Sequence, residues 1–145
     1  MKNTTEHYRK LERMYVTSAL NASFKPELTV SQAQARLSYV ITPAHHHAAH
    51  SGHGAIIFKA LDDAAFFAAS SLNEACFMVT ASFNIHYLRP IVDGELTAIA
   101  KVVNQSKRSM LVEVSARNNE DKLIARGTGS FMPSRMPLNH EVGYV

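Results

Sequence analysis

The stretch HGAIIFKALDDAAFFAA, residues 53–69, predicts a glycine-primed helix that is apolar almost all round. A helix that is apolar on every side is normally buried within its own protein. The two acids in its middle, Asp62 and Asp63, are costly in such surroundings unless they are paired, hydrated or used in chemistry. We therefore expect a buried central helix that carries one acidic site.

The two acids have different surroundings on this helix. At about 100° per residue, Lys59, Asp63 and Ser70 form a narrow polar stripe, and Lys59 and Asp63 have the i,i+4 spacing of a salt bridge. Asp62 lies about 100° further round, and the helix explains its presence less well. Two interpretations of Asp62 stay open at this point: a partner from another strand or subunit, or a role in chemistry.

The start of the helix is the second candidate element. Ser51 is a possible N-cap, and Gly54 and Ala55 present backbone N–H groups at the positive end of the helix dipole. Such donors can hold an oxyanion, as acyl-transfer chemistry requires. The carboxylate of Asp62, about two turns further along, would act as a general base on water or as a nucleophile.

The remaining sequence predicts one further helix and several strands. An amphipathic helix is expected at about 5–20, ended by Phe24-Lys25-Pro26, and a first strand at 35–42. Four more strands follow the central helix, at 78–88, 96–103, 109–117 and 122–131. Short turns, such as the one at Asp93-Gly94, predict antiparallel pairing of consecutive strands as a meander.

The strand at 78–88 alternates between two faces. The predicted buried face holds Val79, Ala81, Phe83, Ile85 and Tyr87, and the other face holds Thr80, Ser82, Asn84 and His86. We expect an α+β fold in a single domain spanning 1–145, in which an antiparallel sheet wraps around the central helix. Its core spans about 28–133, and residues 134–145 form an extended tail.

These residues resemble the hotdog-fold acyl-coenzyme A thioesterases, specifically the phenylacetate-pathway (PaaI)-like group. That group has His-Gly-Gly followed by an acid nine residues after the histidine. Here His53-Gly54 is followed by Ala55 in place of the second glycine, and Asp62 has the same spacing from His53. Its next strand reads Thr-x-x-x-Asn-x-x-aromatic-x-x-Pro, which the segment from Thr80 to Pro90 matches. The segment 123–131 resembles the family's ending, so the likeness covers about residues 35–132.

The resemblance implies a function and a site. The function would be hydrolysis of an acyl- or aryl-coenzyme A thioester, with Asp62 as base or nucleophile and the amides of Gly54 and Ala55 as oxyanion hole. Thr80 would assist, in the family from the neighbouring subunit. His47 stands where the family has a water-orienting Asn. The implied assembly is a homodimer or a dimer of dimers, with no cofactor other than the coenzyme A of the substrate.

Substrate binding is expected to involve several cations and the loop before the helix. The residues expected to bind substrate are His53, Arg89, Lys107 and Arg108. The five histidines between 45 and 53 lack interleaved Cys or carboxylate, so we expect a polar loop along the substrate channel and no metal site.

Composition limits the alternatives. The chain has 145 residues, 46% of them apolar, a net charge of +3 and one cysteine, Cys76. It shows no signal peptide, no membrane-length apolar run and no nucleic-acid-reading motif, which favours a cytoplasmic protein. Two other functions stay open: a hotdog enoyl-coenzyme A hydratase or dehydratase, and a non-catalytic acyl-coenzyme A-binding protein.

Overall fold

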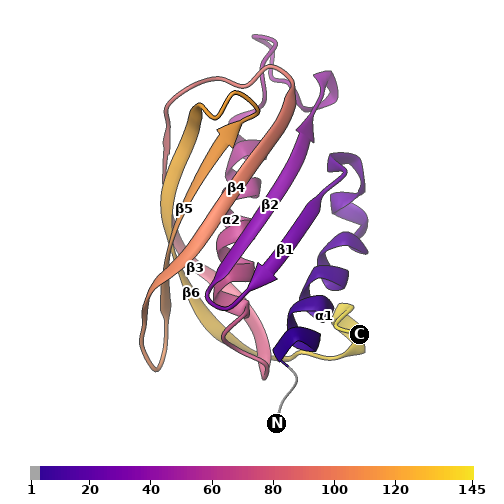
Figure 1. Cartoon of the computed structure of the whole chain (residues 1–145), viewed down its shortest axis with the longest axis vertical. Coiled ribbons are helices and arrows are strands. Elements are labelled where there is room, and N and C mark those ends of the chain that lie inside the picture. Colours follow the sequence, from indigo (N-terminus) through magenta and orange to yellow (C-terminus); the bar gives the residue numbers. More distant parts are fainter. Residues whose placement is uncertain (1–3) are drawn as a thin grey trace.

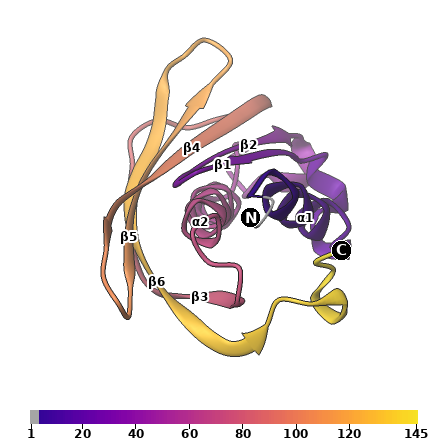
Figure 2. The same ribbon diagram turned by 60° about the horizontal axis from the view of Figure 1, so that its bottom comes forward.

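The computed structural model describes residues 4–145 and shows an antiparallel sheet of six strands curled around one long helix, α2 (Gly54–Ser70). Figure 2 shows this helix inside the curl, with a second helix, α1 (Thr4–Val16), beside it on the open side of the sheet. The expected α+β architecture is therefore confirmed. No helix in the described part of the chain is long and apolar enough to cross a membrane.

Small side chains let α2 lie close to the sheet. Five alanines of this helix have no exposed surface: Ala60, Ala64, Ala65, Ala68 and Ala69. Leu61 and Phe67 fill the remaining space, and both are buried. The helix limits agree with the prediction, because an apolar run of this length has no other environment in which it is stable.

The strands run along the sheet in an order that the sequence does not predict. Their bounds are β1 (Glu27–Ser31), β2 (Gln34–Ile41), β3 (Cys76–Tyr87), β4 (Gly94–Gln105), β5 (Met110–Asn118) and β6 (Leu123–Pro137). The order is β1-β2-β4-β5-β6-β3 (Figure 1).

The expected meander is thus correct for β4, β5 and β6 but wrong for β3, which pairs with β6 at the far edge. The segment 88–93 crosses the end of the curled sheet, so Asp93-Gly94 leads into β4 and closes no hairpin between β3 and β4. Strand β1, which pairs with β2, was not predicted at all.

A bulge in β3 changes which side chains face the helix. The register of β3 against β6 shifts between Thr80 and Ser82, so one extra residue enters the strand there. Before the bulge Met78 is buried and Val79 is 44% exposed, which reverses the predicted faces. Beyond it Phe83 is half-buried and packs against Phe58 of α2, as the alternation predicts. The strict period of two assumed for this strand fails because of the inserted residue.

Both ends of the chain depart from the predictions. Helix α1 ends at Val16, and a 3-10 helix, Ala19–Phe24, leads into β1. The residues after β6 are not extended, because they form a 3-10 turn at His140–Val142. His7 of α1 explains this packing: its ring bonds the hydroxyl of Tyr144 through Nδ1 (2.7 Å) and donates through Nε2 to the carbonyl of Ser70 (2.9 Å).

The close approach of β6 to β3 generates a test of this packing. A Cβ added at Gly127 would lie 2.4 Å from the backbone carbonyl oxygen of Asn84, which cannot move without shifting β3. We expect Gly127→Ala to lower the free energy of unfolding by about 2 kcal/mol, as overpacking of a core does. The exposed neighbour Thr128→Ala is the control, and urea unfolding is the measurement. Equal stability of both variants would contradict the close approach.

Candidate active site

The carboxylate of Asp62 lies in a cleft between α1 and β3. Its Oδ1 accepts a hydrogen bond of 2.8 Å from the Thr80 hydroxyl. The bulge after Thr80 turns this hydroxyl toward the helix, so the contact forms within one chain. In the expected arrangement, the neighbouring subunit supplies the threonine; here Asp62 and Thr80 of the same chain are already in contact.

The cleft has a volume of about 420 Å³ and is mostly apolar. Asp62 and Thr80 lie in its wall, together with polar side chains of Lys59 and Asp63. Its main apolar lining is Met14, Phe66, Phe67, Phe77, Met78 and Val142. Such a lining suits an apolar group bound close to a carboxylate.

The surroundings of Asp62 shift its ionisation. Burial raises the pKa of Asp62 above its ordinary value, and the adjacent carboxylate of Asp63 raises it further. The hydrogen bond from Thr80 and the charge of Lys59 act in the opposite direction. A carboxylate with a raised pKa in a cleft is suited to accept a proton.

The neighbouring acid, Asp63, has the partner that the helix spacing predicts. Its Oδ2 lies 2.5 Å from Nζ of Lys59. The same oxygen also accepts hydrogen bonds from the hydroxyls of Tyr15 (2.6 Å) and Tyr39 (2.9 Å). These two tyrosines belong to α1 and β2, and no spacing in the sequence reveals that they meet at this helix.

The start of α2 differs from the expectation in its cap. The N-cap is His53 and not Ser51, because Nδ1 of His53 accepts the Ala55 N–H at 2.9 Å. The Ala55 amide is therefore already bonded, whereas within residues 4–145 no group accepts a hydrogen bond from the Gly54 N–H. Tyr87 secures this helix start by donating its hydroxyl to the Gly54 carbonyl at 2.8 Å. Of the two backbone amides expected to hold the oxyanion, the Gly54 N–H is thus the free one.

A second cavity, of about 600 Å³, opens at this helix start. It brings together five of the predicted residues: His47, His53, Gly54, Ala55 and Arg89. The guanidinium of Arg89 donates to the carbonyl of Leu123 at 2.9 Å, which holds the charge at the cavity wall.

The histidine-rich loop is built from local hydrogen bonds. His45 is buried, stacks on Phe24 at 4.7 Å and accepts the Thr42 N–H through Nδ1. His46 bonds the carbonyl of Val92. His47 accepts the backbone N–H of residue 49 and bonds the hydroxyl of residue 51. No group of three or more His, Cys, Asp or Glu side chains that could hold a metal ion occurs in the described part of the chain.

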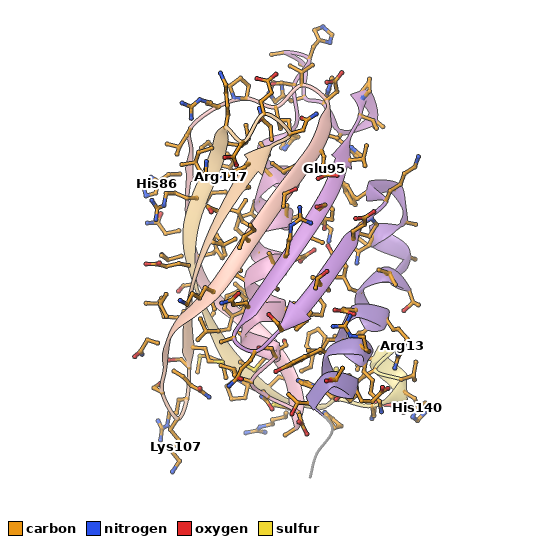
Figure 3. The ribbon with its side chains drawn as sticks, viewed as in Figure 1. Arg13, His86, Glu95, Lys107, Arg117 and His140 are labelled. Carbon is orange, nitrogen blue, oxygen red and sulfur yellow. The ribbon has the colours of Figure 1, made fainter. Side chains whose placement is uncertain are left out.

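The predicted residues thus fall into three separate places within one chain. Asp62 lies seven residues after Ala55, about 10 Å further along the helix axis, and lines a different cavity. Lys107 and Arg108 line a third cavity, near the C-terminal end of α2 and the turn between β4 and β5. Figure 3 shows Lys107 at the end of the molecule opposite to Glu95, the second residue of β4.

Comparison with known proteins identifies the family. The model of the Thioesterase superfamily matches residues 51–125, which is more than half of the chain, so the chain belongs to this superfamily. A protein of Saccharolobus solfataricus named "Putative esterase" is 28% identical over 88% of this chain and 73% of its own length. A second esterase-named protein of that organism is 33% identical, but the match spans only 54% of this chain and 56% of the relative.

A solved structure confirms the hotdog fold. The Escherichia coli PaaI protein from the phenylacetic acid degradation operon superposes with a TM-score of 0.83 at 21% identity, covering 92% of this chain and 97% of that one. The expected thioesterase superfamily is therefore confirmed, and the likeness to the PaaI protein is confirmed for the fold.

The raised pKa of Asp62 predicts a pH-dependent stability difference. Because the folded state favours the protonated form, the contribution of Asp62 is fully present below its ordinary value of 3.8 and is lost as the pH rises through the raised value. Asp62→Asn cannot ionise and keeps an acceptor for Thr80. We expect its melting temperature to exceed that of the wild type by a few degrees at pH 7 and by less at pH 4. A less stable variant at pH 7 would contradict the burial argument.

Proposed function

We propose that this member of the thioesterase superfamily hydrolyses the thioester bond of an acyl- or aryl-coenzyme A. The observation that carries the proposal is the Asp62 carboxylate, held by Thr80 in the wall of an apolar cleft. An acyl group would occupy the apolar part of the cleft and present its carbonyl carbon to the acid. The mildly basic charge of +3 suits a substrate that carries phosphates.

Asp62 would act as a general base or as a nucleophile. As a base it takes a proton from water, whose oxygen attacks the carbonyl carbon. The negative charge that develops on the carbonyl oxygen is stabilised by the free N–H of Gly54 and the helix dipole. Collapse of this intermediate breaks the C–S bond and leaves the carboxylic acid, and the proton held by Asp62 passes to the departing thiolate, which gives the thiol and restores the carboxylate. Thr80 would orient the carboxylate throughout.

Two chains are needed to build such a site. An attacking group and an oxyanion donor must both lie about 3 Å from one carbonyl group, whereas Asp62 and the helix start of one chain are about 10 Å apart along the helix. Strand β3 is an edge of the sheet and is open to pairing. We therefore infer a homodimer, alone or as a dimer of dimers, joined through this edge.

The contacts of β3 support that arrangement. Thr80 touches Asp62 and Tyr87 touches Gly54, seven residues further along the same strand. If two copies of β3 pair antiparallel about a point between these residues, Tyr87 of each copy comes to lie opposite Thr80 of the other. The helix start of one copy then approaches Asp62 of its partner.

The contacts of Asp62 disfavour the hydratase alternative. Hotdog hydratases usually pair a histidine with an acid, whereas in the described structure Asp62 receives its side-chain hydrogen bond from Thr80. A non-catalytic acyl-coenzyme A-binding protein would not require an acid in the wall of an apolar cleft, where a charge is costly.

The activity is tested with a panel of short, long and aryl acyl-coenzyme A thioesters, followed by release of free thiol. We expect turnover by the wild type and a loss of about 10²- to 10⁴-fold in Asp62→Asn, the usual contribution of a positioned base. Asp121→Asn, an exposed acid in a turn, is the matched control. Binding without thiol release, or hydration of an enoyl-coenzyme A, would favour one of the two alternatives.

The two-chain site is tested by mixing inactive variants. Gly54→Pro removes the free N–H at the first helical position, where proline is tolerated, and Gly54→Ala keeps it. We expect Gly54→Pro and Asp62→Asn to be inactive alone and to recover about a quarter of wild-type turnover when unfolded and refolded together, because each hybrid dimer holds one intact site. A site contained in one chain would show no recovery.

A further inference from the structure

A charged cluster beside Asp62 is not explained by the proposed reaction. It consists of Lys59, Asp63, Tyr15 and Tyr39, and we call it the Asp63 cluster. One oxygen of Asp63 accepts from all three other members, at 2.5 Å, 2.6 Å and 2.9 Å. The members come from α2, α1 and β2, so the cluster ties three elements together at one atom.

The ammonium group of Lys59 is enclosed by aromatic rings. Nζ lies 5.4 Å, 5.8 Å and 5.7 Å from the ring centroids of Tyr15, Phe24 and Tyr39, within the range of cation–π contacts. Only 19% of the Lys59 side chain and 20% of the Asp63 side chain are exposed. A pair that is this well enclosed and hydrogen-bonded keeps its charges in fixed positions.

The two tyrosines act in this cluster as permanent donors. Burial, and then the charge of Asp63, raise the pKa values of Tyr15 and Tyr39 far above the ordinary value. Both hydroxyls therefore stay protonated, and their oxygen atoms lie in contact with each other. They hold the carboxylate of Asp63 without removing its charge.

The cluster lies directly beside the proposed catalytic acid. Lys59 precedes Asp62 by three residues and Asp63 by four, so its side chain projects from α2 between the directions of the two carboxylates. Lys59, Asp63 and Tyr15 line the same cleft as Asp62. Tyr39 is fully buried behind them. The charged and titratable groups around Asp62 are therefore Lys59 and Asp63 from α2, Tyr15 from α1 and Tyr39 from β2, while β3 contributes the neutral Thr80.

We propose that Lys59 and Asp63 are positioning residues whose opposed charges control whether Asp62 is ionised, and that Tyr15 and Tyr39 keep this pair in place. The charge of Lys59 favours the ionised form of Asp62, and the charge of Asp63 disfavours it. The inference rests on the proposed role of Asp62 in hydrolysis, but its central claim concerns ionisation and can be measured without turnover.

The test uses variants with effects of opposite sign. On the acidic limb of the pH profile, we expect Lys59→Met to lower kcat/KM by about three- to tenfold and Asp63→Asn to raise it by a similar factor. The double variant should return close to the wild type, because it removes both charges. If Lys59→Met alone does not fold, the double variant still provides a test, because it leaves no unpaired ion in the fold. Lys101→Met, an exposed lysine of β4, is the control.

The same variants are titrated by carboxyl carbon NMR, with the Asp62 signal assigned through Asp62→Asn. We expect the midpoint to rise in Lys59→Met and to fall in Asp63→Asn. Shifts in the same direction, or no shift in either variant, would overturn the inference and leave the cluster a structural tie between α1 and α2. Opposite NMR shifts in a protein that releases no thiol would support the inference while rejecting the proposed hydrolysis, so the two failures are distinguishable.

Discussion

The close packing of α2 against the curled sheet is the constraint on which the rest of the structure depends. Alanine side chains on the helix leave little space between the two layers, so the strands bend around the helix axis (Figure 2). Every polar group on this helix must then emerge at the open side of the curl or find a buried partner. The polar groups in the middle of the helix have hydrogen-bond partners and also face the open space between β3 and α1. They are Lys59, Asp62 and Asp63.

Much of the fold can be predicted from the sequence because the patterns that produce it are local. The apolar run of α2 and the alternation of β4, β5 and β6 need no knowledge of distant residues. The placement of β3 beyond β6 depends on how a sheet closes around a helix, which no turn signal encodes. The sequence also does not predict the bulge after Thr80, since one inserted residue does not visibly interrupt the alternation of apolar and polar side chains along the strand.

Only part of the candidate site was predictable from the sequence. Spacing pointed to the salt bridge between Lys59 and Asp63 and singled out Asp62 as the acid without a local explanation. The contact of the tyrosines with Asp63 depends on tertiary packing, and the capping of Ala55 by His53 depends on a side-chain rotamer. Neither can be predicted from spacing in the sequence. Lys107 and Arg108 are expected to bind substrate on the basis of charge alone, and in one chain they lie at a cavity separate from Asp62 and from the helix start.

Part of the cleft wall comes from a different region of the sequence than the groups proposed to react there. Asp62, Thr80 and Gly54 all fall within residues 51–125, the segment matched by the superfamily model. Met14 and Val142, by contrast, reach the cleft from α1 and from the turn after β6, outside that segment. Exchange of the two flanking segments between relatives would therefore change only part of the cleft wall and leave in place the groups proposed to react there.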